Sequence, residues 1–303
     1  MSEEISAMLE IRGLTKAFRS KEVLKGVDLT VPTGSVFGFV GKNGAGKTTT
    51  MKAVLGLLRP DKGEILVAGE PVTFGETKTN RSVGYLPDVP EFYGFLSPIE
   101  YLTLSGESLG LEKKELRARC EELLVRVGLE KENRRIGGFS RGMKQRLGIA
   151  QALLSRPKLL ICDEPTSALD PIGRKEILDL LASVRNETTV LFSTHILSDV
   201  ERICTDVAFL EGGKIVLSGD LETLKTHRHA EEFLLETATA DAIPILTAAF
   251  PTARRGEGNI LRFAGGEELM HEVLSFVTAN RVRIDRLQRL EPSLESIFLE
   301  VAK

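Results

Sequence analysis

The stretch GKNGAGKTT, residues 41–49, constrains the fold of this chain more than any other. It fits the pattern G-x-x-x-x-G-K-[S/T] at every fixed position. The apolar run SVFGFV before this stretch predicts a buried strand. The segment TTTMKAVLGLL, which begins at its end, has apolar residues at the spacing of a helix. A strand, a glycine-rich loop and a helix in this order favour a phosphate-binding loop over a turn that holds no ligand.

The backbone of such a loop makes many of the phosphate contacts. Gly41, Gly44 and Gly46 let N–H groups curl around phosphate oxygens, because residues with a Cβ resist the positive φ angles that this needs. Lys47 would reach the β and γ phosphates, and Thr48 would offer its hydroxyl to Mg²⁺. The candidate nucleotide-binding residues here are Gly41, Lys42, Asn43, Gly44, Ala45, Gly46, Lys47, Thr48 and Thr49.

A second motif, LLICDEP at residues 159–165, predicts a buried strand that ends in two carboxylates. Ligands of such folds bind at the carboxyl edge of the sheet. Adjacent strand residues point to opposite faces, so Asp163 and Glu164 can serve one site only if the chain turns there, and Pro165 favours a turn. We expect Asp163 in the Mg²⁺ shell and Glu164 beside the attacking water. The alternative is a solvated acidic loop.

The order of strand-like and helix-like segments predicts an α/β fold with a largely parallel core sheet. The opening of the chain and GEILVAGEPV predict an antiparallel patch, and residues 98–155 predict a helical subdomain. After residue 226 the pattern becomes β-α-β-β-α-β and a final helix, which indicates a small split βαβ, ferredoxin-like domain. We therefore expect a first domain at residues 1–226 and an accessory domain at 227–303.

A third motif, FSRGMKQRLGIAQALL, begins a predicted helix at Ser140. Ser140 suits the N-cap position and could do no more than cap. The free N–H groups of a helix start also favour an anion, so this chain has a second helix start suited to phosphate. One phosphate-binding loop ordinarily binds one triphosphate. The sequence pattern alone therefore does not say which phosphate the second helix start would bind.

Five motifs in order, GKNGAGKT, FSRGM, LLICDEP, SALD and FSTH, resemble the ATP-binding subunit of an ABC transporter over roughly residues 9–219. The resemblance implies a P-loop NTPase cassette that hydrolyses ATP with Mg²⁺. It also implies a dimer with a second cassette, in which the signature helix of one chain caps the γ-phosphate held by the other. Asp170 would lie at the dimer seam and His195 would contact the γ-phosphate. The residues acting in trans would be Ser140, Arg141, Gly142 and Met143.

Phe18 lies where such cassettes place an aromatic ring against adenine, although a core phenylalanine is the rival interpretation. Two positions depart from the family pattern. Asp88 replaces the usual glutamine and could touch Mg²⁺ directly or through water. Arg141 replaces the first signature glycine and could add a charge-assisted phosphate contact.

The segment GYLPDVPEFYGFLSPIEYL and the ending PSLESIFLEV resemble the ABC-2 type exporters, including the bacitracin-export branch. This implies a separately encoded membrane permease as partner and a cytoplasmic location at the inner face of the membrane. The rival readings are a soluble ABC ATPase for DNA repair or translation, and a cassette that binds ATP without hydrolysing it. A net charge of -3 and a pI near 6.0 lack the bulk positive charge that is usual in nucleic-acid binders, so no nucleic-acid partner is expected. Glu164 argues against loss of hydrolysis.

Overall fold

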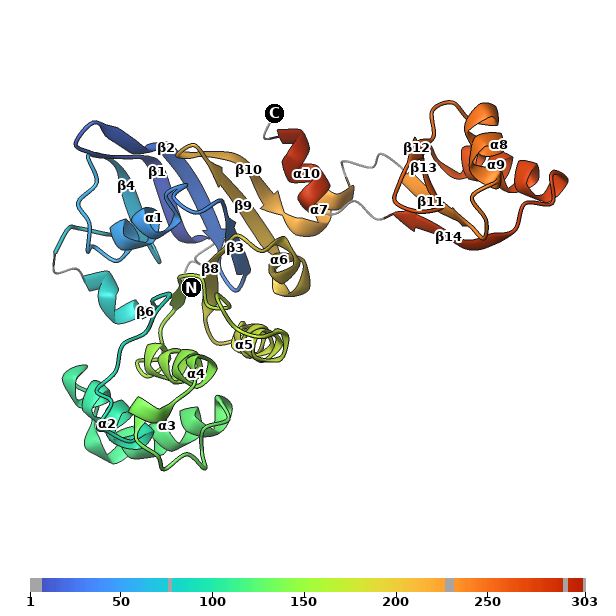
Figure 1. Cartoon of the computed structure of the whole chain (residues 1–303). Helices are drawn as coiled ribbons and strands as arrows, with labels where there is room; N and C mark the ends of the chain where they lie inside the picture. The colour runs from blue at the N-terminus through green and yellow to red at the C-terminus, as the bar shows by residue number, and fades with distance from the viewer. Residues whose placement is uncertain (1–6, 76–77, 227–231, 291–293, 302–303) are drawn as a thin grey trace, which may run out of the picture. The chain divides into compact units, whose positions relative to one another are not determined.

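The computed structural model describes residues 7–75, 78–226, 232–290 and 294–301, and its contacts divide them into two compact units (Figure 1). The first unit ends at Leu221 and the second begins at Glu222. Whether the chain can be cut near the expected boundary at residue 226 stays a prediction. Each unit is described separately below.

The first unit is built on a six-stranded sheet in the order β10-β9-β3-β8-β7-β6. Three of its inner strands, β3, β8 and β7, are buried at every residue, which explains their largely apolar sequences. All neighbours are parallel except β9 and β10, so the largely parallel core is confirmed. The strands are β3 (Val36–Val40), β6 (Val83–Leu86), β7 (Leu159–Cys162), β8 (Thr189–Thr194), β9 (Asp206–Glu211) and β10 (Lys214–Asp220).

The expected antiparallel patch is a separate four-stranded sheet in the order β2-β1-β4-β5. Its strands are β1 (Ala7–Phe18), β2 (Lys21–Pro32), β4 (Lys62–Val67) and β5 (Glu70–Pro71). Helix α1 (Lys47–Val54) joins the two sheets, because Met51 belongs to one core cluster with Leu9 and Val27 of this sheet and Phe39 of the parallel sheet. The helix that follows the glycine-rich loop is therefore held on both sides by apolar packing.

Three helices, α2 (Pro98–Ser108), α3 (Lys113–Arg126) and α4 (Arg141–Ala152), lie together in the region predicted as a helical subdomain (Figure 1). Ser97 and Glu100 form a capping box at the start of α2, with Pro98 at the first helical position. The remaining helices of this unit are the short turns η1 (Lys78–Ser82) and η2 (Ile136–Gly138), then α5 (Pro171–Ser183) and α6 (Leu197–Ile203). Helix α7 (Leu221–Thr226) spans the division between the units.

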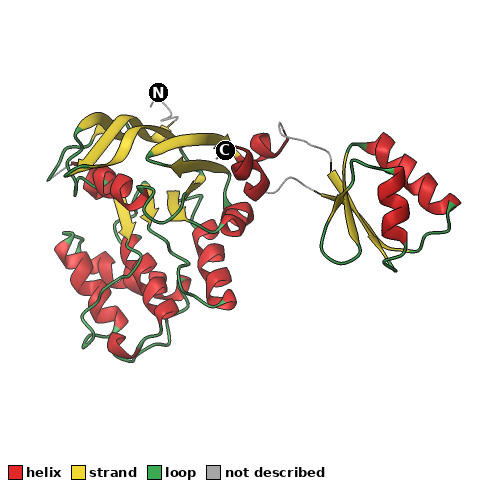
Figure 2. Ribbon diagram, turned by 45° about the horizontal axis from the view of Figure 1, so that its top comes forward, coloured by secondary structure: helices red, strands yellow, loops and turns green. Residues whose placement is uncertain are grey.

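The second unit has the strand and helix order that the sequence predicts. Its sheet is antiparallel in the order β12-β13-β11-β14, and two helices lie on one face of it (Figure 2). Phe233 and Phe263 stack with ring centroids 4.9 Å apart and pack with Leu246 and Val273 of the helices. The elements are β11 (Glu232–Thr237), α8 (Ala242–Ala249), β12 (Arg254–Arg255), β13 (Ile260–Ala264), α9 (Glu267–Ala279), β14 (Ile284–Leu290) and α10 (Leu294–Val301).

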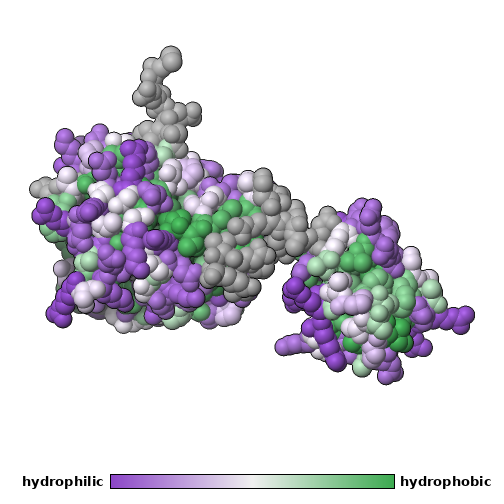
Figure 3. Space-filling model, turned by 90° about the horizontal axis from the view of Figure 1, so that it is seen from above, coloured by the Kyte–Doolittle hydropathy of each residue, from purple (hydrophilic) through white to green (hydrophobic). Residues whose placement is uncertain are grey.

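On the face seen in Figure 3, hydrophilic side chains surround smaller apolar areas on each unit. Within the described ranges, no helix is both long enough and apolar enough to cross a bilayer.

Candidate nucleotide site

The glycine-rich loop lies between the end of β3 and the first residue of α1. Gly44 and Gly46 have φ angles of 82° and 117°, a region that favours glycine. The positive φ expected at Gly41 is wrong: a Cβ there would lie 2.6 Å from the Leu210 carbonyl oxygen, so close packing requires the glycine instead. A Cβ on Gly46 would also come within 2.7 Å of the Leu24 side chain, so no larger residue fits there. The first N–H groups of α1 have no partner inside the helix and open into the loop, which suits them to phosphate oxygens.

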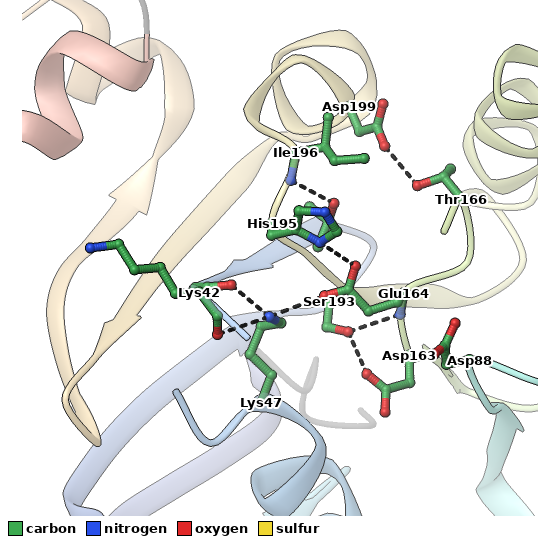
Figure 4. A network of polar contacts seen from close by, with 12 residues as sticks. Lys42, Lys47, Asp88, Asp163, Glu164, Thr166, Ser193, His195, Ile196 and Asp199 are labelled. Carbon is green, nitrogen blue, oxygen red and sulfur yellow. Dashed lines mark hydrogen bonds and ion pairs between the residues drawn. The ribbon is translucent and has the colours of Figure 1, made fainter. Parts of the chain in front are cut away.

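Lys47 is the buried cation of this loop, with only 5% of its side chain exposed. Its Nζ donates to the carbonyl oxygens of Gly41 at 2.6 Å and Lys42 at 3.4 Å. The same nitrogen lies 3.0 Å from Glu164 Oε1, and Glu164 Oε2 lies 2.8 Å from His195 Nδ1 (Figure 4). Three residues predicted separately as catalytic therefore form one line of contacts.

Glu164 turns the chain at the end of β7 by its own backbone conformation. Its φ of 47° lies in the left-handed region, which is unusual for a residue with a side chain. Such strain concentrates at functional sites. The turn expected from Pro165 thus begins one residue earlier, and it brings both carboxylates to one site. Apart from its ion pair with Lys47, Glu164 Oε1 accepts no hydrogen bond within the described part of the chain, so this buried oxygen can accept one more.

Ser193, near the end of β8, fixes this turn and was not singled out from the sequence. Its hydroxyl accepts from the Glu164 N–H at 2.9 Å and donates to Asp163 Oδ1 at 2.6 Å. Asp199 is a second missed residue, 2% exposed, which accepts from Thr166 at 2.7 Å and pairs with Arg174 at 2.6 Å. It ties the loop after β7 to α6. Serine and aspartate are too common at strand and helix ends for either to stand out in one sequence.

The candidate Mg²⁺ residues also meet. Thr48 Oγ1 donates to Asp163 Oδ2 at 2.7 Å, so a hydroxyl and a carboxylate face the same point. Among the described residues no cluster of three or more His, Cys, Asp or Glu side chains could hold a metal. The protein thus offers two hard oxygen donors and leaves the other positions to phosphate oxygens and water, which fits Mg²⁺ that arrives with a nucleotide.

A pocket of about 330 Å³ is lined by the glycine-rich loop, by the carboxylates Asp163 and Glu164, and by Asp88. The Asp88 carboxylate pairs with Arg141 at 3.1 Å. Tyr85 lies beneath on β6, and burial together with the Asp163 carboxylate raises the pKa of its phenol to about 12, so it stays neutral. The residues lining the pocket are Val23, Asn43, Gly44, Gly46, Lys47, Thr48, Thr49, Asp88, Asp163 and Glu164.

Other predicted residues lie outside this lining. Ser140 caps α4 by accepting from the Met143 N–H at 3.2 Å, and Asp170 caps α5 by accepting from the Gly173 N–H at 3.1 Å. Phe18 is 47% exposed at the end of β1, with Lys16 Nζ 5.5 Å from its ring centroid. The core position considered for Phe18 is therefore wrong, and its stacking on adenine stays a prediction.

Comparison with known proteins agrees with this geometry. The family model described as ABC transporter matches residues 24–167. The ABC transporter ATP-binding protein YxlF of Bacillus subtilis (strain 168) is 44% identical over 301 residues, which span 97% of this chain and 99% of YxlF. The chain belongs to the ABC transporter ATP-binding proteins. It is an ATPase of this family, whose members bind ATP.

Two further relatives of this ABC cassette bear on its partners. The bacitracin transport ATP-binding protein BcrA of Bacillus licheniformis is 40% identical over 224 residues, covering 73% of this chain and 72% of BcrA. The ATP-binding cassette MJ0796, solved as a dimer in a post-hydrolysis state with ADP and phosphate, superposes with a TM-score of 0.61 and 26% identity. That match covers 71% of this chain and 99% of MJ0796.

Proposed function

We propose that this chain binds Mg-ATP at residues 41–49, pairs with a second cassette, and powers a separately encoded ABC-2 type permease in export. The observation that carries the proposal is the line from Lys47 through Glu164 to His195, beside the Thr48 and Asp163 pair. The cassette would work at the cytoplasmic face of the membrane through its permease. A soluble ATPase of DNA repair or translation is the less favoured alternative.

The proposed chemistry is phosphoryl transfer to water. Glu164 accepts the proton of the attacking water on Oε1, the oxygen that faces Lys47, and His195, bonded to Oε2, holds the carboxylate in place. Lys47 stabilises the charge that develops on the phosphate oxygens. Thr48 and Asp163 would hold Mg²⁺, which would neutralise negative charge on the phosphates.

The pairing of two cassettes is supported by the position of the signature helix. Residues 140–143 at the start of α4 do not line the pocket of their own chain, although this helix start suits an anion. A second chain facing this end would give it a γ-phosphate to bind. The dimeric MJ0796 cassette shows that a related protein does assemble in pairs.

The permease partner is supported by an exposed aromatic segment, residues 89–95, between β6 and α2. Val89, Tyr93 and Phe95 are 60%, 58% and 62% exposed, and the rings of Tyr93 and Phe95 lie 5.9 Å apart. Grouped exposed aromatic residues are typical of protein interfaces. The relative BcrA is named for bacitracin transport, which favours a transport role over the soluble alternative.

The docking of the permease is tested by a Tyr93→Ser, Phe95→Ser double variant. We expect weaker copurification with the ABC-2 type permease from detergent extracts and less permease-stimulated ATP turnover, while basal turnover stays the same. Phe74→Ser is the matched control, because Phe74 is 59% exposed but lies outside this segment. Full permease stimulation in the double variant, or equal losses of basal and stimulated turnover, would contradict docking at residues 89–95.

A chain ending at Thr226 should bind Mg-ATP with the affinity of the full chain. Among the described residues, all members of the core cluster that holds α1 lie before residue 216, and the second unit has a core of its own. Calorimetric titration measures the affinity, and circular dichroism confirms that the truncated chain is folded. A folded truncation without ATP affinity would show that the cassette boundary is wrong.

A further inference from the structure

The two positions at which this sequence departs from its family pattern contact each other. Arg141 donates from its guanidinium to Asp88 Oδ1 at 3.1 Å, although the residues are far apart in the chain. Asp88 lines the nucleotide pocket, and Arg141 is the first residue of the signature helix α4. The pair therefore links a chain's own pocket to the helix that is expected to serve the partner's nucleotide.

A second contact holds Asp88 in place without Arg141. Gln145, one turn further along α4 on the same face, is fully buried and donates from its amide to the Asp88 carbonyl oxygen at 2.7 Å. This bond fixes the backbone of residue 88 at the edge of the pocket. Arg141 adds a positive charge beside the Asp88 carboxylate and orients that carboxylate toward α4.

The charge matters because the pocket is acidic. Its described lining contains three carboxylates, Asp88, Asp163 and Glu164, and one ammonium group, Lys47, which pairs with Glu164. A nucleoside triphosphate adds further negative charge. The Asp163 carboxylate is hydrogen-bonded by Thr48 and Ser193, whereas the Asp88 carboxylate pairs with Arg141. Without that partner, Asp88 would repel the incoming phosphates.

We propose that Arg141 acts within its own chain as a positioning residue: it turns the Asp88 carboxylate toward α4 and compensates its charge, so that the pocket accepts Mg-ATP. The inference rests on the proposed function and adds a role in cis to a residue for which the family resemblance implies one in trans. It makes the affinity of a single chain for nucleotide depend on its own signature helix.

The test is Mg-ATP affinity at protein concentrations where light scattering shows a monomer. Arg141→Ala should raise the Kd roughly three- to fivefold, the size of a partly exposed charge contact. Adding Asp88→Asn to Arg141→Ala should restore the parental Kd, since the repelling charge is gone. Arg141→Lys should keep most of the affinity, and the Arg141→Ala effect should shrink at high salt.

Each other outcome is distinct. An unchanged monomer Kd for Arg141→Ala would overturn the role in cis and leave only one in trans. A double variant weaker than both single variants would also overturn it, because Asp88 would then bind metal or nucleotide itself. A parental chain with no affinity for Mg-ATP would refute the proposed function. That result is seen in the unsubstituted protein, so it can be told apart from a failure of the role of Arg141. Both side chains are partly exposed, 40% and 46%, so the variants are expected to fold.

Discussion

Lys47→Ala should lower ATP turnover by about a hundredfold or more, the size of loss seen when a main electrostatic stabiliser is removed from an active site. Lys47 is 5% exposed and is the ammonium group in the described pocket lining. Without it the triphosphate loses its cationic partner, and Glu164 loses the ion pair that faces the loop. Phosphate release from Mg-ATP measures the turnover.

The matched control is Lys52→Ala, on the same helix but exposed to solvent. It removes the same charge from α1 without touching the pocket, so its turnover should equal that of the parental chain. Near-normal turnover in Lys47→Ala, or an equal loss in Lys52→Ala, would refute the assignment of residues 41–49 as the nucleotide site.

Glu164→Gln should bind Mg-ATP but lower hydrolysis by about 10² to 10⁴, the usual contribution of a general base. The amide keeps the size of the side chain and loses the proton acceptor. Lys47, Thr48 and Asp163 remain to hold the nucleotide. Calorimetric titration gives the affinity, and phosphate release gives the turnover.

Glu121→Gln is the control for this variant, because Glu121 is 58% exposed on α3, away from the pocket lining. It should hydrolyse ATP at the parental rate. A Glu164→Gln chain that also hydrolyses at the parental rate would show that another group takes the proton.

Much of the cassette fold follows from sequence pattern. The strands around residues 36–40, 159–162 and 189–194 were predictable because strands buried on both faces of a parallel sheet read as apolar runs. The glycine-rich loop was predictable because its backbone needs glycine at Gly44 and Gly46. Both signals are local in the chain.

The details of the site depend on contacts between distant segments. The left-handed turn at Glu164 is held by a hydrogen bond from its N–H to Ser193 on the next strand of the sheet. The sequence around either residue does not predict this bond. The sequence marked Asp88 and Arg141 as departures, but only the packing of α4 beside β6 shows that they meet. For Phe18 the sequence favoured stacking on adenine but kept a core position as the rival, because an aromatic residue at a strand end suits both.

The central claim is that a second chain completes the site through its signature helix. The measurement that tests it most directly is the mass of Glu164→Gln by size-exclusion chromatography with light scattering. With Mg-ATP the mass should double from the 33.2 kDa of one chain, because nucleotide bound only in the pair shifts association. Adding Ser140→Arg, which crowds the start of α4, should abolish the dimer. A Glu164→Gln chain that binds Mg-ATP and remains at 33.2 kDa at high concentration would contradict the claim.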